Sequence, residues 1–212
     1  MLTVHHLATS QSDRIEWLCE ELGVVFDLKR YERDPVTRLA PAEYRALHPI
    51  GTAPVIADGN LVLGESAAII DYIIHQYGKG RLAVAPGEAG YSDYLFWFHF
   101  ANGSFMPAAM MGLVAGILAA GGSAAVGALT ERLDRAWDMV EARLGESPYL
   151  AGADFTAADI MTLFPLTTMR LFAPRDIAGY PNIATYLQRI GERDAFKRAM
   201  AKADPGFVVP LT

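Results

Sequence analysis

The chain has 212 residues, of which 52% are hydrophobic and 20% are charged, and its 18 basic and 24 acidic side chains give a net charge of −6. This much apolar material excludes the disordered, collagen-like and low-complexity classes of protein. Residues 1–80 contain 7 basic and 11 acidic side chains and the rest contain 11 and 13, so neither part has the basic excess of a nucleic-acid-binding domain.

Strand-like and helix-like runs alternate through the first eighty residues. The apolar spacing over 15–22 is that of an amphipathic helix, which Gly23 ends. Asp58-Gly59 is a strong hairpin turn signal between two short strands. This order of elements predicts a mixed sheet covered by helices. The predicted elements are strand 2–7, helix 15–22, strand 24–31, short helix 41–47, strands 54–57 and 61–63, and helix 67–77.

Every periodic segment after residue 88 is helical, and we predict a kink at Pro107 in the first of them. Glycine and proline punctuate residues 81–88, which we interpret as a linker. The expected organisation is an α/β domain over 1–80 and an all-α domain over 89–212. The predicted helices cover residues 91–118, 123–144, a segment from about 156, 183–191 and 194–202.

Three helix starts carry capping signals. Ser12 and Ser66 each precede or open a helical run, and we expect their hydroxyls to cap it. Thr156-Ala-Ala-Asp159 has the form of a capping box. These predictions concern folding, and we assign the capping box no catalytic role.

One segment is apolar enough to raise the question of a membrane. Residues 94–130 contain no Asp, Glu, Lys or Arg, and Gly112 and Gly116 have GxxxG spacing. Pro107, the Gly121-Gly122 pair and the lack of flanking basic residues argue against a span. We therefore predict a buried helix in a soluble protein, with no membrane partner and no nucleic-acid partner.

The N-terminus and the cysteine content bear on compartment and metal binding. Cys19, the single cysteine, excludes an internal disulfide and a multi-cysteine metal site, and it fits the cytoplasm. His5 and His6 interrupt the first apolar run, so we expect no signal peptide. Because they alternate across a strand they cannot chelate one ion, and we predict no metal site.

Several motifs, at their spacing and in this order, resemble the cytosolic glutathione transferase family, most closely its bacterial and fungal Gtt-like branch. The resemblance implies a thioredoxin-like first domain that binds glutathione, a helical second domain that shapes the electrophile site, a homodimer and a role in detoxification. It implies glutathione as a co-substrate and no cofactor. The motifs lie within residues 9–23, 48–56, 63–69, 97–107 and 150–159.

The Ala53-Pro54 pair is the first candidate for peptide binding. A proline at the start of a strand can be cis, which opens the backbone of residue 53 to an extended peptide, and the alternative is an ordinary trans proline on an edge strand. The resemblance implies that the peptide is glutathione, with Ser66 at its γ-glutamyl carboxylate and Glu65 at its ammonium. Thr52 stands where the family usually has a basic residue. The implied glutathione-binding residues are Gln11, His48, Thr52, Ala53, Pro54, Glu65 and Ser66.

Ser10 is the catalytic candidate, with Thr9 and Ser12 as its competitors. It lies between a strand and a helix, where its hydroxyl can stabilise the reactive thiolate of glutathione. Lowering a thiol pKa of about 8.5 by two requires about 2.7 kcal/mol. A hydrogen bond to a charged group contributes about 1.5–3 kcal/mol and a helix N-terminus about 0.3–1 kcal/mol, so no general base is needed.

The electrophile site is expected on the first long helical segment. Its apolar and adaptable side chains suit a promiscuous pocket, and core packing is the alternative interpretation for each. The implied reaction is attack of the thiolate on an electrophilic carbon or on a peroxide oxygen. Two rivals stay open: a glutathione-dependent isomerase or reductase on this scaffold, and a non-catalytic glutathione- or ligand-binding module. The candidate electrophile-site residues are Phe98, Asn102, Phe105, Met106 and Met110.

Overall fold

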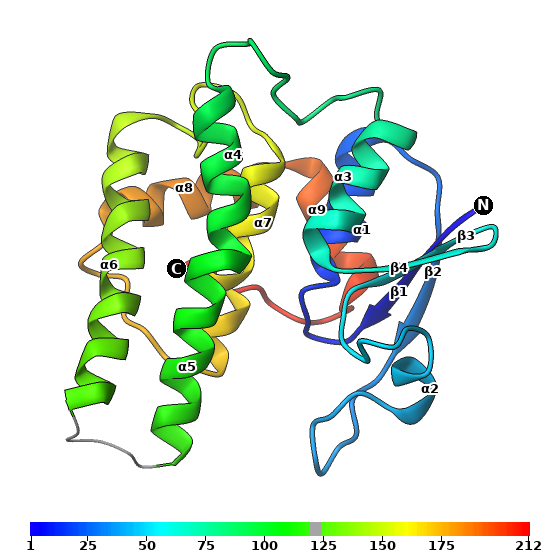
Figure 1. Ribbon diagram of the computed structural model, residues 1–212, viewed down its shortest axis with the longest axis horizontal. Coiled ribbons are helices and arrows are strands. Elements are labelled where there is room, and N and C mark those ends of the chain that lie inside the picture. The colour runs from blue at the N-terminus through cyan, green and yellow to red at the C-terminus, as the bar shows by residue number, and fades with distance from the viewer. Residues whose placement is uncertain (119–123) are drawn as a thin grey trace. The chain divides into compact units, whose positions relative to one another are not determined.

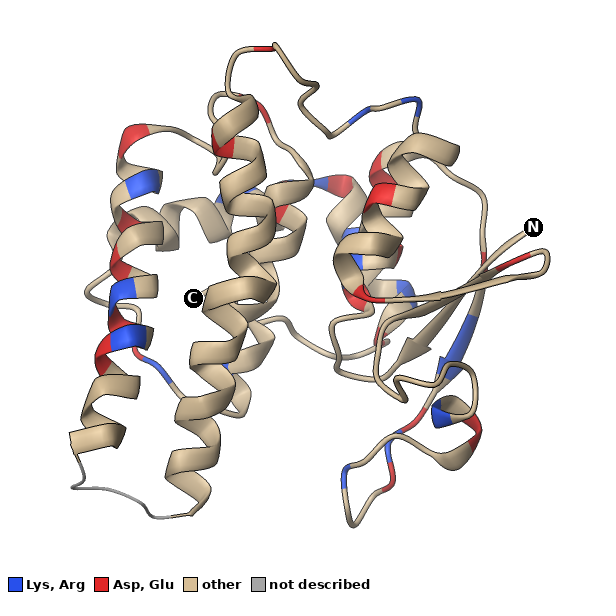
Figure 2. Ribbon diagram, viewed as in Figure 1, with Lys and Arg blue, Asp and Glu red and all other residues tan. Residues whose placement is uncertain are grey.

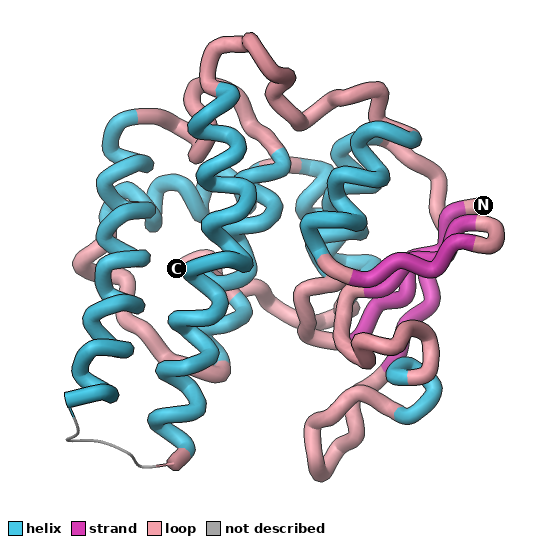
Figure 3. Tube along the Cα trace, in the orientation of Figure 1, coloured by secondary structure: helices cyan, strands magenta, loops and turns pink. Residues whose placement is uncertain are grey.

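The computed structural model describes residues 1–118 and 124–212, which divide into two compact units. Unit 1 comprises residues 1–83 and 192–209, and unit 2 comprises residues 84–191 and 210–212. Among the described residues, every extended strand belongs to unit 1 and unit 2 is built from helices (Figure 3). The predicted class, an α/β domain followed by a helical one, is confirmed.

Unit 1 contains a mixed four-stranded sheet with the strand order β2-β1-β3-β4. β1 pairs in parallel with β2 and antiparallel with β3, and β3 and β4 form the predicted hairpin at Gly59, whose φ of +59° suits glycine. Helices α1 and α3 cover one face of the sheet and α2 lies against the other (Figure 1). The elements are β1 (Leu2–Leu7), α1 (Asp13–Leu22), β2 (Asp27–Tyr31), α2 (Ala42–Arg45), β3 (Val55–Asp58), β4 (Leu61–Gly64) and α3 (Ser66–Gln76).

Helix α9 (Asp194–Ala203) belongs to unit 1, although the sequence assigned it to the helical domain. It packs along α1, where the rings of Trp17 and Phe196 meet edge to face at 5.1 Å. Arg193 donates two hydrogen bonds of 2.7 Å to the carboxylate of Glu21. Helical periodicity predicts that α9 forms, but it does not identify the helix against which the apolar face packs.

Unit 2 is a helical bundle whose first segment is interrupted by one π-helical turn, η1 (Ala101–Phe105). The π turn ends two residues before Pro107, so the interruption lies beside the predicted kink: the helix continues from α4 into α5, and a proline offers no N–H to the turn before it. Ser123 and the Gly121-Gly122 break lie outside the described residues. The helices are α4 (Tyr91–Phe100), α5 (Met106–Ile117), α6 (Ala124–Glu146), α7 (Ala157–Leu166), the short 3-10 helix η2 (Thr168–Leu171) and α8 (Pro181–Glu192).

The capping box of α7 is confirmed. The side chain of Thr156 accepts a hydrogen bond from the N–H of Ala158 at 3.3 Å, and Asp159 accepts one from the N–H of Thr156 at 2.9 Å. Asp159 is buried and also accepts the N–H of Leu150 at 3.0 Å, so one carboxylate joins the start of α7 to the preceding loop.

Charge is distributed unevenly over the helices of unit 2. Basic and acidic residues alternate along α6, whereas α5 carries none (Figure 2). Residues Tyr91–Ile117 are long and apolar enough to span a membrane by composition, and a third of this stretch is buried within the structure. The π-helical turn in its middle and its packing on α6 and α7 are features of a bundle helix.

Candidate functional site

Three loops of unit 1 leave the sheet at one edge. Val55 at the start of β3 pairs with His5 of β1 on one side and with Gly64 at the end of β4 on the other. The end of β1, the start of β3 and the end of β4 therefore lie side by side. This register brings together the loops that carry Ser10, Ala53 and Glu65, which are far apart in the sequence.

The loop after β1 has an unusual backbone conformation. Thr9 has a φ of +52°, in the left-handed region that a residue with a side chain rarely adopts. Its N–H donates to Oδ2 of Asp204 at 3.0 Å, and Arg33 Nε donates to the carbonyl of Ala8 at 2.8 Å. These partners, from the segment after α9 and the segment after β2, stabilise the loop in this conformation.

Ser10 lies in this loop and is 5% exposed. Its hydroxyl donates to the carbonyl of Leu7 at 2.6 Å, and its Oγ is 2.8 Å from Oγ of Ser12. Ser12 accepts the N–H of Leu7 at 3.1 Å and makes no side-chain cap on α1, so the prediction that it caps this helix is wrong. Its hydroxyl is turned back toward β1, where its partners are the N–H of Leu7 and the imidazole of His6.

The Ala53-Pro54 peptide bond is cis, as the sequence suggested. Pro54 is buried, Ala53 is half-buried and Thr52 is exposed. In the part of the chain that the structure describes, the backbone N–H and carbonyl of Ala53 have no hydrogen-bond partner. An extended peptide can therefore pair with this residue as an added strand would.

The start of α3 presents an acidic side chain and a set of backbone N–H groups. Glu65 is exposed, has a φ of +72° and is the N-cap residue of α3. Ser66 is the first helical residue and makes no side-chain cap, so the predicted cap is wrong. Its hydroxyl instead accepts from Nη1 of Arg14 at 3.3 Å, and the same nitrogen donates to Gln11. Arg14 thus joins the Ser10 loop to the start of α3.

His48 completes the edge. Its Nδ1 accepts the N–H of Ile50 at 3.2 Å, and a side chain on Gly64 would meet this nitrogen at 3.2 Å, so the imidazole packs against the end of β4. The glycine at position 64 allows this approach. In the described ranges, no three His, Cys, Asp or Glu side chains are placed to share a metal ion.

The five candidate electrophile-site residues do not share one accessible surface. Phe98, Phe105 and Met106 are buried, with Met106 in a cluster that includes Phe164. Asn102 is half-buried on the π-helical turn, and Met110 is 44% exposed on α5. Core packing, the alternative interpretation, therefore describes three of the five.

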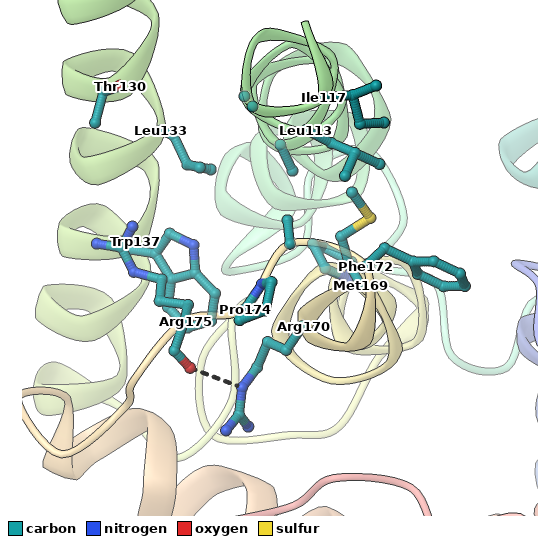
Figure 4. Close-up of a pocket in the computed structure, with 15 residues that line it drawn as sticks. Leu113, Ile117, Thr130, Leu133, Trp137, Met169, Arg170, Phe172, Pro174 and Arg175 are labelled. Atoms are coloured by element: carbon teal, nitrogen blue, oxygen red, sulfur yellow. Dashed lines mark hydrogen bonds between the residues drawn. The ribbon is translucent and has the colours of Figure 1, made fainter. Parts of the chain in front are cut away.

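A cavity of about 490 Å³ lies elsewhere in unit 2, and the sequence reasoning missed it. Leu113 and Ile117 of α5, Leu133 and Trp137 of α6 and the segment 165–175 line it (Figure 4). Gly112 and Gly116, which were considered only as a membrane signal, also line it, so their small size is the signal that could have revealed it. At the rim of the cavity, the guanidinium of Arg175 donates to Oδ1 of Asp134 at 2.8 Å and to the hydroxyl of Tyr180 at 2.5 Å.

Comparisons with known proteins find relatives that match both units. A family model described as the glutathione S-transferase N-terminal domain matches residues 9–76, and one described as the glutathione S-transferase C-terminal domain matches residues 123–189. Glutathione S-transferase 3 of Zea mays is 31% identical over 89% of this chain and 87% of its own length. Glutathione S-transferase 3 of Schizosaccharomyces pombe is 29% identical over 96% and 88%.

Solved structures extend the likeness to the fold. A glutathione S-transferase from Actinobacillus pleuropneumoniae is 32% identical, superposes with a TM-score of 0.89 and is matched over 97% of this chain and 95% of its own. A sphingomonad glutathione S-transferase complexed with glutathione has the same fold at 23% identity and a TM-score of 0.75, matched over 95% and 98% of the two chains.

Proposed function

Because this chain belongs to the glutathione S-transferase family, we propose that the sheet edge formed by the loops of Ser10, Ala53 and Glu65 binds glutathione and activates its thiol. The activity is that of a glutathione transferase, in which the thiolate attacks an electrophile. The observation that carries the site assignment is the register of the sheet: Val55 pairs with His5 and with Gly64, which brings the three loops to one edge.

Each part of the tripeptide has a chemical match on this edge. The unpaired backbone of Ala53 suits the cysteinyl residue of glutathione. The N–H groups at the start of α3 and the hydroxyl of Ser66 suit the γ-glutamyl carboxylate, and exposed Glu65 suits its ammonium group. We assign the glycyl carboxylate to Thr52 and His48, which offer weaker donors than a lysine or an arginine would.

Ser10 is the group that we assign to the sulfur. Its hydroxyl donates a hydrogen bond to the Leu7 carbonyl, with 2.6 Å between the two oxygens. Rotation about the Cβ–Oγ bond can redirect this donor to a thiolate. A hydroxyl hydrogen bond to a charged sulfur contributes about 1.5–3 kcal/mol, against about 2.7 kcal/mol for a two-unit fall in thiol pKa. Gln11 follows Ser10 in the chain, and Nη1 of Arg14 donates to both Gln11 and Ser66.

The electrophile is assigned to the accessible side of η1 and α5, through Asn102 and Met110. Phe98, Phe105 and Met106 support that surface from the core, because their side chains are buried. Met110 is flexible and 44% exposed, which suits acceptors of varied shape. Reduction of hydroperoxides by the same thiolate is the second candidate activity, since a peroxide oxygen is also an electrophile.

The test is retention on immobilised glutathione followed by initial rates with chlorodinitrobenzene and with an organic hydroperoxide. Conjugation of chlorodinitrobenzene is the expected result. Retention without turnover of either acceptor would identify a binding module instead, and failure to be retained would overturn the glutathione site. A screen of further electrophiles then ranks acceptors by kcat/KM.

We also assign a homodimer and a cytoplasmic location to this protein. Support for a dimer comes from the large apolar side chains that α4, α5 and the residue after α5 leave exposed. Sedimentation at about twice the chain mass of 23.1 kDa is expected at micromolar concentration, and sedimentation at the chain mass would contradict the assignment. The exposed side chains concerned are Leu95, Phe96, Val114, Ile117 and Leu118.

A further inference from the structure

A cluster of buried ionisable side chains lies directly behind the Ser10 loop. His6 of β1 and Glu16 of α1 are both fully buried, and Asp204, after α9, is 8% exposed. Nδ1 of His6 is 2.9 Å from Oε1 of Glu16, and Nε2 is 3.2 Å from Oδ2 of Asp204. A carboxylate therefore flanks each nitrogen of the imidazole, and none of these three residues has a part in the reaction as described so far.

The two carboxylates determine where the protons of this ring lie. A carboxylate oxygen accepts hydrogen bonds and donates none, so a ring nitrogen that faces one carries a proton. Burial lowers the pKa of His6, but the neighbouring Asp204 and Glu16 outweigh burial and raise it to about 9. Arg30, 3.5 Å from Asp204, keeps that carboxylate paired as well. Nδ1 of His6 thus carries one proton, and of its two neighbours at 2.9 Å only Oγ of Ser12 has hydrogen-bond geometry, because neither oxygen of Glu16 has a hydrogen-bond partner among the described residues.

Counting donors and acceptors then orients both serine hydroxyls. Oγ of Ser12 accepts from Nδ1 of His6 at 2.9 Å and from the N–H of Leu7 at 3.1 Å, which occupies both of its lone pairs. Its own proton must be donated, and Oγ of Ser10 at 2.8 Å is closer than the Leu7 carbonyl at 3.4 Å.

The same count applies to Ser10. Its Oγ receives the Ser12 hydroxyl and, at 3.3 Å, the N–H of Ser12, so both of its lone pairs are occupied as well. Only its proton is left to interact with a ligand. In this structure that proton is donated to the Leu7 carbonyl.

We propose that His6 is a positioning residue for the transferase reaction: through Ser12 it occupies the acceptor sites of the Ser10 hydroxyl, so that this hydroxyl faces the glutathione sulfur as a donor only. When the thiolate binds, the Ser10 proton turns from the Leu7 carbonyl to the sulfur, and no other hydrogen bond in the chain has to reverse. Asp204 contacts both His6 and the Ser10 loop, because it flanks the imidazole of His6 and accepts the N–H of Thr9 in that loop. The inference rests on the proposed role of Ser10.

The test measures the pKa of enzyme-bound glutathione from the ultraviolet absorbance of its thiolate. His6→Leu is expected to raise this pKa by roughly 0.5 to 1 and to lower kcat/KM about 3- to 10-fold at neutral pH, because a chain of hydrogen bonds loses its first donor. His6→Asn, whose amide nitrogen reaches the place of Nδ1, is expected to restore most of both. His5→Leu is the matched control: His5 bonds Tyr31 instead, at 2.9 Å, and its loss should leave the thiol pKa unchanged.

Ser12→Ala provides a second route if His6→Leu does not fold, because it leaves both carboxylates beside the imidazole. It should reproduce the rise in thiol pKa. In a Ser10→Ala background, neither change should have a further effect. A folded His6→Leu or Ser12→Ala protein with an unchanged thiol pKa, or an equal rise in the Ser10→Ala background, overturns the inference. If Ser10→Ala itself leaves the thiol pKa unchanged, the proposed role of Ser10 fails first.

Discussion

The two units support the residues proposed for the site by different means. In unit 1, the Ser10 loop is fixed by directed hydrogen bonds to Leu7, Arg33 and Asp204. In unit 2, the surface assigned to the acceptor rests on apolar packing of residues such as Phe105 and Met106. Directed bonds specify the place of one atom, whereas apolar packing specifies only a shape. This difference suits the proposed site, in which one thiol reacts with acceptors of varied shape.

A change of pH tests the polar support of unit 1 most directly. The folded-state pKa of His6 is about 9, above its ordinary 6.5, so its stabilising contribution is complete below pH 6.5 and is lost as pH rises through 9. We expect the free energy of unfolding to fall by about 3 kcal/mol over this interval.

Denaturant unfolding at a series of pH values measures this fall. His6→Gln, which cannot titrate, should remove most of the slope, while Thr156→Ala in unit 2 should keep it. A slope that survives in His6→Gln would show that other groups cause the pH dependence and that the polar support of unit 1 is weaker than described.

Ser10→Ala gives the next largest effect. Loss of a hydrogen bond to a charged sulfur should lower kcat/KM by about 10- to 100-fold at neutral pH, while the Kd of glutathione changes little. The deficit should shrink as pH rises, because the thiol then ionises without help. A deficit independent of pH would assign Ser10 to another step.

Thr156→Ala examines unit 2. Removing the capping hydroxyl of α7 should lower the free energy of unfolding by about 1 kcal/mol. Because this box supports packing alone, the thiol pKa and kcat/KM measured below the melting range should match the unchanged protein. A changed thiol pKa would mean that the second unit also positions the sulfur.

The smallest effect is expected at the acceptor surface. Met110→Ala should raise KM for a bulky apolar acceptor about 2- to 5-fold, since part of one side chain's apolar contact is lost. Leu113→Trp, which fills the cavity beside α6, is the matched comparison and should leave KM unchanged. A larger effect from Leu113→Trp would move the acceptor site into that cavity.

Local pattern was enough to predict the elements of both units, because periodicity and turn residues act over short distances. It also predicted the capping box of α7. The Ala53-Pro54 cis bond was expected only with the family resemblance, because the pair by itself favours an ordinary trans proline on an edge strand. The cap at Ser12 was wrong because its hydroxyl bonds the N–H of Leu7 and the imidazole of His6 instead, and the cap at Ser66 was wrong because its hydroxyl accepts from the guanidinium of Arg14.

The sequence did not reveal which residues distant in the chain contact one another in the fold. His6 was considered only as half of a pair with His5, and nothing near it in the chain indicates Asp204. Helix α9 was recognised as a helix but assigned to the helical domain, because the apolar face of a helix does not identify the element that packs against it. The cavity of unit 2 depends on the fit of α5 against α6 and has no local signal beyond two glycines.

The grouping of residues 192–209 with unit 1 has a consequence for biosynthesis. A ribosome translates all of residues 84–191 between the two pieces of this unit, so a nascent chain can complete its sheet while Asp204 does not yet exist. During that interval the imidazole of His6 faces Glu16 alone and Thr9 lacks its anchor. Apart from residues 210–212, the helical unit is therefore synthesised before unit 1 is complete, and the Ser10 loop acquires its last partner only after α9 has emerged.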